Sequence, residues 1–295
     1  MFVWHGIPDV TCLARPRTGF TEGACEGRTG HVEAIPISAK DTNLSTPTPS
    51  ENAPLRGPVA AVIPAAGRGV RLGPGAPKAL RALGGVPILV HAVRAMLRAR
   101  AVALVVVVAP ADGVAEVRAL LDGNGLPESK EIKVVAGGDT RQESVRLGLA
   151  ALPDDTAIVL VHDAARPLVP VETVEAVVAA VRDGAPAVVP AVPLADTVKE
   201  VDPAPRPDAP EPVVGTPERG RLRAVQTPQG FRRDVLAEAH EKVTGAVTDC
   251  AGMAERIGVP VVVVPGHEEA FKVTRPLDLV LAEAVLARRR AADVF

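Results

Sequence analysis

Aromatic side chains are scarce in this chain of 295 residues. It contains no tyrosine, one tryptophan and five phenylalanines, and aromatic residues make up 2% of the sequence. Proteins that bind single-stranded nucleic acid stack bases on aromatic rings and pair basic surfaces with phosphates. The formal net charge of −2 offers no broadly basic surface either. We therefore predict no nucleic-acid partner, and tyrosine chemistry is excluded.

Cysteine is also rare. The three cysteines, Cys12, Cys25 and Cys250, form no CxxC pair. They provide neither a disulfide framework nor a zinc site, which is typical of a protein from a reducing compartment. The longest apolar run, from Ala101 to Pro110, is about half the length of a membrane-spanning helix. We therefore predict a cytoplasmic protein with no membrane partner.

Acidic residues are missing from one part of this otherwise balanced sequence. Between Asn52 and Ala111 there are eight lysines or arginines and no aspartate or glutamate. A solvated helix face that carries Arg94 and Arg98 accounts for some of these charges. The remaining cations favour an anionic ligand close to this segment.

Residues 1–57 lack the hydrophobic periodicity of a helix or a strand. The segment is rich in threonine, serine, proline and glycine, which is typical of a disordered extension. It fits neither the pattern of a signal peptide nor that of a transit peptide. A start codon assigned too far upstream explains the segment equally well. We therefore expect one folded domain over residues 58–295.

From residue 58 onward, apolar runs of strand length alternate with amphipathic stretches of helical length. Continuously apolar runs such as Val102 to Ala109 are typical of parallel strands that are covered on both faces. This alternation predicts an α/β fold, a mainly parallel twisted sheet with helices on both faces. The predicted strands are 59–64, 102–109, 132–136, 157–161, 187–192 and 259–264, and the predicted helices are 88–100, 114–121, 140–151, 171–182, 249–257 and 275–290.

One segment is incompatible with a helix or a central strand. Five prolines lie between Pro203 and Pro212. Proline removes a backbone donor and clashes with the preceding helical turn. We therefore predict that residues from about 194 to 226 project from the body of the domain as an arm.

The loop that follows the first predicted strand has the composition of a phosphate-binding loop. In open α/β sheets, ligands bind beyond the carboxyl ends of the strands. The loop from Pro64 to Lys78 is rich in glycine and alanine and carries Arg71 and Lys78. Small residues let backbone N–H groups approach a phosphate, and the cations neutralise it. The loop lacks the Gly-Lys-Ser/Thr ending of a P-loop and the GxGxxG pattern of a dinucleotide site.

Two further loops offer polar side chains to a ligand. Gly137-Gly-Asp-Thr-Arg-Gln-Glu-Ser144 presents Asp139 and Ser144 to a base or a ribose, although helix capping by Thr140 explains part of this sequence. Phe271-Lys-Val-Thr-Arg-Pro276 presents Lys272 near a helix start, where it suits an anionic group.

A carboxylate and a guanidinium follow the strand that ends at Val161. They belong to the sequence His162-Asp-Ala-Ala-Arg-Pro167. Asp163 is a candidate ligand for Mg²⁺ beside phosphate oxygens, and a structural ion pair with Arg166 is the alternative. His162 is interpreted as a packed or hydrogen-bonding residue, because no second histidine lies in any of these motifs.

The four loops, in this order and near these spacings, resemble the motifs of the 2-C-methyl-D-erythritol 4-phosphate cytidylyltransferase family of the non-mevalonate isoprenoid pathway. The similarity covers residues from about 58 to 291. Its motifs are P-A-A-G-x-G-x-R with a later P-K, G-G-D-x-R-x-x-S, H-D-A-A-R-P, D-T-x-K on the arm, T-P-Q, T-D and K-V-T-R-P. The resemblance implies cytidylyl transfer from CTP to the sugar-alcohol phosphate, with pyrophosphate released.

The resemblance implies further properties. These are a Rossmann-like nucleotidyltransferase fold, Mg²⁺ dependence, and a homodimer in which each arm reaches the partner's site, so that Thr197 and Arg219 act there. Carried over by position, the nucleotide-binding residues are Ala65, Ala66, Gly67, Gly138, Asp139 and Ser144, the catalytic residues are Arg71, Lys78, Arg219 and Lys272, and the substrate-binding residues are Asp163, Arg166, Thr197, Arg219, Thr248 and Lys272.

The sequence departs from the family pattern in two places. Cys250 and Gly252 follow Thr248-Asp249 where the family has an acidic residue and a serine, and the proline-rich arm is longer. Two other functions stay open. One is ribitol 5-phosphate cytidylyl transfer, which would use the same phosphate-binding loop with a different acceptor pocket. The other is a nucleotide-binding module without catalysis, which the retained Arg71, Lys78 and Asp163 disfavour.

Overall fold

The structure is a computed structural model that describes residues 55–67, 78–204, 206, 209–245 and 247–292. All of these belong to one compact unit, Thr48–Phe295. The predicted extension lies outside the described residues except for its last three, and Arg71 lies outside them as well. The backbone N–H of Leu55 donates to the carbonyl of Arg182 at 2.9 Å, and its side chain packs against the core. The folded domain therefore begins a few residues before the predicted boundary at residue 58.

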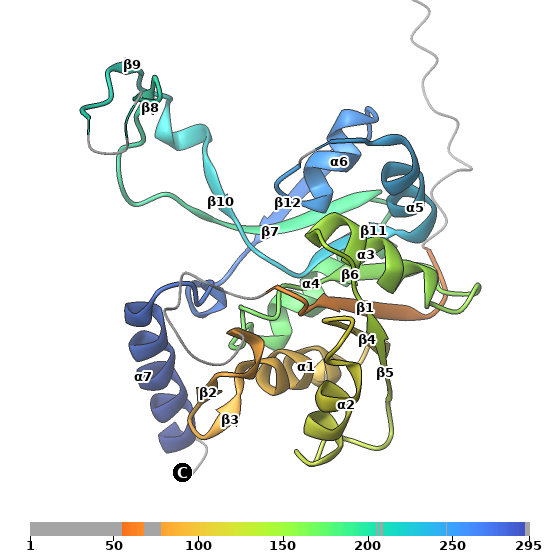
Figure 1. The fold of residues 1–295 in the computed structure, drawn as a ribbon. Helices are drawn as coiled ribbons and strands as arrows, with labels where there is room; N and C mark the ends of the chain where they lie inside the picture. The colour runs from red at the N-terminus through yellow and green to blue at the C-terminus, as the bar shows by residue number, and fades with distance from the viewer. Residues whose placement is uncertain (1–54, 68–77, 205, 207–208, 246, 293–295) are drawn as a thin grey trace, which may run out of the picture. The chain divides into compact units, whose positions relative to one another are not determined.

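An eight-stranded sheet forms the centre of the described fold (Figure 1). Its order is β10-β7-β11-β6-β1-β4-β5, and β12 also pairs with β7. Only β10 and β11 run antiparallel to their neighbours, so the prediction of a mainly parallel sheet is confirmed. The strands are β1 (Val59–Pro64), β4 (Val102–Ala109), β5 (Glu131–Ala136), β6 (Ile158–Val161), β7 (Ala187–Pro193), β10 (Arg223–Val225), β11 (Gln229–Arg232) and β12 (Val261–Pro265).

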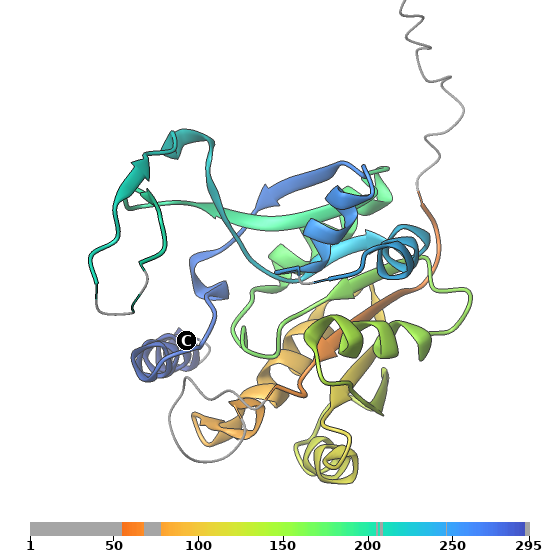
Figure 2. The same ribbon diagram turned by 45° about the horizontal axis from the view of Figure 1, so that its top comes forward.

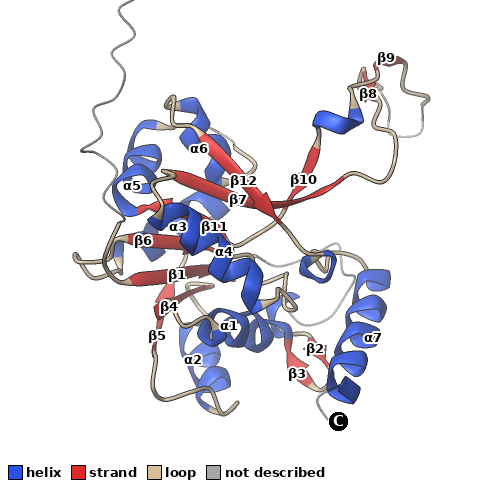
Figure 3. Cartoon of the chain, turned by 180° about the vertical axis from the view of Figure 1, so that it is seen from behind, coloured by secondary structure: helices blue, strands red, loops and turns tan. Residues whose placement is uncertain are grey.

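Helices cover both faces of this sheet, because successive residues of a buried strand point to opposite sides. In β1, Ala61 and Ile63 belong to the hydrophobic core on one face, whereas Ala60 and Val62 belong to the core on the other. The two layers can be followed in Figures 1 and 3, which view the sheet from opposite sides. The first layer contains α1 (Ile88–Arg98), α2 (Val114–Asp122) and α4 (Val171–Arg182), and the second contains α3 (Arg141–Ala150), α5 (Arg233–Lys242) and α6 (Cys250–Arg256).

A smaller core joins the last helix to a short hairpin. The helix α7 (Pro276–Ala292) packs beside β2 (Ala82–Leu83) and β3 (Val86–Pro87), with Leu83, Val273 and Ala282 fully buried between them. Figure 2 views α7, in blue, nearly along its axis beside this hairpin. Within the described ranges, no helix has the length and apolar character needed to cross a membrane.

The proline-rich segment forms an arm with a small sheet of its own. Its strands β8 (Glu200–Val201) and β9 (Val213–Gly215) pair only with each other, and Figure 1 shows them beyond the ends of β7 and β10. None of the described residues from Val192 to Val225 is buried. The arm is therefore held by backbone pairing rather than by a hydrophobic core.

Candidate active site

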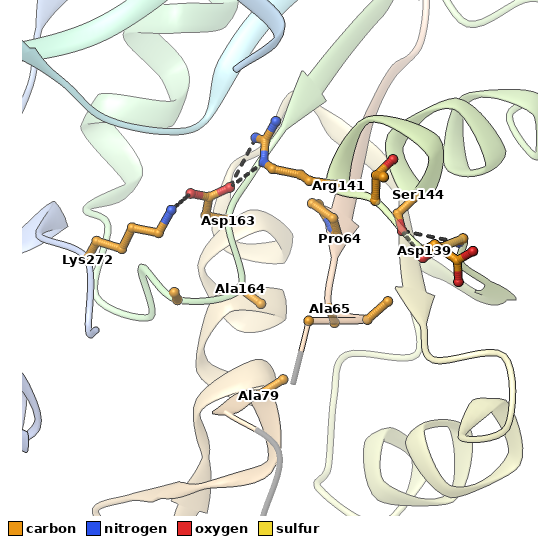
Figure 4. Close-up of a pocket in the computed structure, with 14 residues that line it drawn as sticks. Pro64, Ala65, Ala79, Asp139, Arg141, Ser144, Asp163, Ala164 and Lys272 are labelled. Carbon is orange, nitrogen blue, oxygen red and sulfur yellow. Dashed lines mark hydrogen bonds and ion pairs between the residues drawn. The ribbon is translucent and has the colours of Figure 1, made fainter. Parts of the chain in front are cut away.

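Four chain segments that are far apart in the sequence, together with Ala79 of a short 3-10 helix, line one cavity of about 220 Å³. They follow β1, β5 and β6, and precede α7, so the cavity lies at the carboxyl ends of the parallel strands, as predicted. Figure 4 shows its side chains. Of the described residues, the lining comprises Pro64, Ala65, Ala66, Gly67, Ala79, Gly138, Asp139, Thr140, Arg141, Ser144, Asp163, Ala164, Ala165 and Lys272.

Asp163 lies between two cations on one wall of the cavity (Figure 4). Its Oδ1 accepts from Nε and Nη2 of Arg141 at 3.3 and 3.1 Å, and its Oδ2 accepts from Nζ of Lys272 at 2.7 Å. The carboxylate side chain is 12% exposed. Burial raises the pKa of Asp163, but the charges of Arg141 and then Lys272 outweigh burial and hold this pKa well below its ordinary value. Asp163 is therefore ionised at neutral pH.

The start of α3 fixes the loop opposite Asp163. Thr140 caps the helix by accepting from the N–H of Glu143 at 3.0 Å, and Glu143 Oε2 accepts from the N–H of Asp139 at 3.0 Å. Ser144 Oγ lies 3.3 Å from both the nitrogen and the oxygen of Gly138. A Cβ on Gly138 would lie 2.2 Å from Cδ of Glu143, so a larger residue there would displace the glutamate that accepts from the N–H of Asp139. The loop is thereby held rigidly against the cavity.

A buried histidine is linked to the backbone of Asp163 through the hydroxyl of Thr227. His162 has no exposed surface, and its Nε2 lies 3.1 Å from the carbonyl of Arg166. Because that carbonyl only accepts, Nε2 carries the proton and Nδ1 accepts from the Thr227 hydroxyl at 3.1 Å. The same hydroxyl accepts from the N–H of Asp163 at 3.0 Å. The interpretation of His162 as a packed, hydrogen-bonding residue is confirmed.

Comparison with known proteins identifies the family of this chain. The sequence profile of the 2-C-methyl-D-erythritol 4-phosphate cytidylyltransferase family matches residues 59–288. The chain belongs to this family. A relative of that name from Streptomyces avermitilis is 73% identical over 246 residues, which cover 83% of this chain and 98% of the relative. Another from Streptomyces coelicolor is 75% identical over 236 residues, which cover 80% and 87%.

Solved structures with the same fold carry related names. The 2-C-methyl-D-erythritol 4-phosphate cytidylyltransferase of Thermus thermophilus is 36% identical, with a TM-score of 0.58 over 77% of this chain and 98% of the other. The 4-diphosphocytidyl-2C-methyl-D-erythritol synthase of Anaerococcus prevotii is 28% identical, with a TM-score of 0.67 over 78% and 96%. The Rossmann-like nucleotidyltransferase fold expected from the sequence is therefore confirmed.

The structure brings together many of the residues to which the cytidylyltransferase motifs gave a role. The cavity is lined by the predicted nucleotide-binding residues and by Asp163 and Lys272. Lys78 begins the short 3-10 helix Lys78–Leu80 beside the lining residue Ala79, and its side chain lies outside the described part of the structure. The nucleotide-binding residues in the lining are Ala65, Ala66, Gly67, Gly138, Asp139 and Ser144.

Arg166 and Thr248 are not brought into the cavity. The Nη1 and Nη2 atoms of Arg166 donate to the backbone carbonyls of Ala270 and Val225 at 2.6 and 3.2 Å, so this guanidinium holds two chain segments together. Thr248 is exposed and lies beside a separate hollow next to α6. Neither residue lines the cavity in this arrangement of the chain, and their predicted substrate contacts stay predictions.

Thr197 and Arg219 lie on the arm, and neither lines the cavity of its own chain. Both are exposed. The Nη1 of Arg219 donates to the carbonyl of Ala195, two residues before Thr197, so the two predicted substrate contacts share one part of the arm. Their predicted action in a partner's site stays a prediction.

Asp163 does not fit a magnesium ion in this arrangement. The described ranges contain no group of three or more histidine, cysteine or acidic side chains that could hold a metal ion. Both oxygens of Asp163 already face cationic nitrogens at 2.7 to 3.3 Å. A divalent cation at Asp163 would be repelled by Arg141 and Lys272. The predicted metal-ligand role of Asp163 therefore finds no support in this geometry, and the magnesium dependence itself stays a prediction.

Arg141 and Thr227 are two residues of the site that were not predicted from the sequence. Both lie inside family motifs, G-G-D-x-R-x-x-S and T-P-Q, so the motifs themselves were the available signal. Their partners could not be deduced, because Asp163 is 22 residues from Arg141 and 64 residues from Thr227. Only the fold places the three residues together.

Lowering the pH from 6.5 to 4 is expected to destabilise the fold through His162. Burial lowers the pKa of His162 to about 4, whereas an unfolded histidine titrates near 6.5. Between these values the unfolded chain binds a proton that the folded chain does not. The free energy of unfolding therefore falls as the pH falls, by up to about 3 kcal/mol from this residue. Urea titrations across this range should give a flatter pH dependence for His162→Gln, and equal slopes would contradict the assignment.

Proposed function

We propose that this protein transfers the cytidylyl group of CTP to 2-C-methyl-D-erythritol 4-phosphate and releases pyrophosphate. The observation that carries the proposal is the cavity itself. In it, the loops after β1 and β5, with their small alanine and glycine residues, face the cluster of Arg141, Asp163 and Lys272. Family membership supports the same reaction, because the similar proteins carry the name of this cytidylyltransferase.

The loops after β1 and β5 suit the nucleotide. Ala65, Ala66 and Gly67 have small side chains, which leave room for a ligand to approach their backbone. Across the cavity, the carboxylate of Asp139 is exposed and offers acceptors to the exocyclic amino group of cytosine. Because Glu143 and Ser144 hold this loop in place, little ordering is needed when CTP binds.

The wall around Asp163 suits the acceptor. Lys272, which is 40% exposed on the cavity wall, offers a positive charge to the acceptor's phosphate. The ionised carboxylate of Asp163 accepts hydrogen bonds from hydroxyl groups, which a sugar alcohol supplies. The cluster therefore matches a ligand that carries both a phosphate and hydroxyls.

In the reaction, an oxygen of the acceptor's phosphate attacks the α-phosphorus of CTP while the bond from that phosphorus to the bridging oxygen of the β-phosphate breaks. The attacking oxygen is already anionic, so no general base is required. His162 could not serve as one, because it is buried and both of its ring nitrogens are hydrogen bonded. Fixed cations stabilise the charge that spreads over the oxygens, and Lys272, Arg71 and Lys78 are the residues proposed to do this.

A pyrophosphate-release assay with CTP and Mg²⁺ tests the function. We expect turnover with 2-C-methyl-D-erythritol 4-phosphate and little with ribitol 5-phosphate. Arg71→Ala and Lys78→Ala should each lower kcat by about 10²-fold or more, since each removes a positive charge that stabilises the transition state. Arg98→Ala is the matched control, an exposed cation of the same acid-free segment that lies outside the cavity. Turnover with ribitol 5-phosphate alone would replace the acceptor, and turnover with neither would indicate a non-catalytic module.

We also propose magnesium dependence and a cytoplasmic location. A triphosphate substrate supports the first, because Mg²⁺ is usually bound through substrate phosphates together with few protein ligands. Loss of turnover in EDTA, with recovery on adding magnesium, is the expected result in the same assay. The scarcity of cysteine supports the second.

We further propose a homodimer in which Thr197 and Arg219 complete the site of the partner. Lys78→Ala and Arg219→Ala should then each be nearly inactive. In a heterodimer of the two variants, one site collects both changes and the other has neither. Random mixing of co-refolded subunits should therefore restore about a quarter of wild-type activity. Failure to recover activity, with heterodimers verified by mass, would contradict arm exchange.

A further inference from the structure

Arg141 and Lys272 approach the same carboxylate from opposite sides (Figure 4). Arg141 is the first residue of α3, whereas Lys272 lies in the segment before α7. Arg141 occupies Oδ1 of Asp163 with two nitrogens, and Lys272 occupies Oδ2 with one. The two cations therefore contact different oxygens, and either one can leave without displacing the other.

The guanidinium of Arg141 is also held from behind. Its Nη1 donates to Sγ of Cys250 on α6 at 3.7 Å, and Cys250 is 1% exposed. The neighbouring Gln142 donates from Nε2 to the carbonyl of Val243 at 2.9 Å. Arg141 is thus held in place by α6, through Cys250, and by the end of α5, through the bond of its neighbour Gln142. Lys272 is the more exposed of the two cations, at 40% against 32%, and it reaches Asp163 through a flexible side chain.

We propose that Arg141 is a positioning residue for the acceptor, acting through Asp163, and this rests on the proposed function. When the acceptor's phosphate draws Lys272 away from Oδ2, the carboxylate would lose its closest cation. A buried carboxylate without a partner is costly. Arg141 keeps Asp163 ionised and in place, so that Oδ2 becomes free to accept from a hydroxyl of the acceptor. Lys272 can then exchange between Asp163 and the phosphate without disordering the site.

The proposal is tested by kinetics of Arg141→Met and Arg141→Lys alone and combined with Asp163→Ala. Arg141→Met should lower kcat/KM for the acceptor by about 10- to 100-fold, the size found when a supporting partner is removed, while the KM for CTP changes little. Arg141→Lys keeps the charge but loses the forked geometry, so it should recover only part of the loss. Arg118→Met, which removes an exposed cation from α2, is the control expected to match the wild type.

The double variant decides whether Arg141 acts through Asp163. If it does, Arg141→Met should add no more than about a twofold loss in the Asp163→Ala background, because no carboxylate remains to be positioned. Losses that multiply, or a KM for CTP that rises as much as that for the acceptor, would overturn the proposal. Melting temperatures show whether each variant is folded, and Arg141→Lys keeps the test valid if Arg141→Met is not. If the wild type turns over neither acceptor, the proposed function is contradicted as well. If the wild type is active but the losses of the two substitutions multiply in the double variant, only the positioning role is contradicted.

Discussion

Replacing Lys272 with alanine is expected to lower kcat/KM for the acceptor by about 10³-fold, the upper range for removing one fixed charge-stabilising group. Lys272 lines the cavity and lies 2.7 Å from Oδ2 of Asp163, so the substitution removes the cation nearest the proposed phosphate position. Asp163 keeps its two bonds to Arg141 in the variant. The fold should therefore remain intact, with a melting temperature close to that of the wild type. Steady-state kinetics together with a thermal melt measure both effects.

Lys133→Ala is the matched control for this substitution. Lys133 forms an ion pair with Glu131 on β5, and its side chain is 38% exposed, against 40% for Lys272. It does not line the cavity. The control should retain wild-type kinetics, because Lys133 lies outside the cavity. It should also retain wild-type stability, since exposed ion pairs contribute little to it. Similar activities for the Lys272 and Lys133 variants would contradict a role for Lys272 at the reacting groups.

The largest loss of stability is expected for Phe231→Ala. Phe231 is fully buried on β11, opposite Val159 of β6 and Ala187 of β7, within the core that α3, α5 and α6 cover. Truncation removes most of a large side chain and leaves a cavity that the packed neighbours can fill only in part. The free energy of unfolding should fall by about 3 to 5 kcal/mol. Urea denaturation followed by circular dichroism measures this change.

Val263→Ala provides the comparison for the core substitution. Val263 lies on β12, which pairs with β7, and is 50% exposed. Its truncation should change the free energy of unfolding by only about 0.5 kcal/mol. A Phe231→Ala protein as stable as this control would show that β11 is not part of the central core. While it remains folded, the Phe231 variant should keep its turnover, because Phe231 does not line the cavity.

The elements with a strong hydrophobic period could be predicted from the sequence. Each predicted strand and helix is present, with its ends displaced by at most two residues. The strand β11 was missed because Gln229 is polar and Gly230 has no side chain to signal burial. Gln229 is nevertheless only 1% exposed. Its burial is tolerated because its Nε2 donates a hydrogen bond to Oδ2 of Asp249 at 2.6 Å. The helix α5 was missed because its buried face is narrow, with Val235, Leu236 and Ala239 among charged neighbours.

The site was predictable to the extent that its residues follow predicted strands. Asp139 and Asp163 lie where β5 and β6 end, so parallel strand order alone brings them to one edge of the sheet. The number of cations around Asp163 could not be predicted, because Lys272 is 109 residues away and Arg141 points across the cavity from a helix. The motifs therefore identified the lining of the cavity, whereas the fold was needed to show which residues bind one another.

The arm differs from the rest of the domain in what holds it together. Its described residues from Val192 to Val225 include none that is buried, so its order depends on a few backbone bonds such as that from Asp202 to the carbonyl of Pro212. Such a segment can open locally at a small cost while the sheet stays folded. The stability of the central sheet therefore depends little on the conformation of the part of the arm that carries β8 and β9. Changes in the length or composition of the arm, which holds five prolines between Pro203 and Pro212, should therefore have little effect on the folding of the domain that carries it.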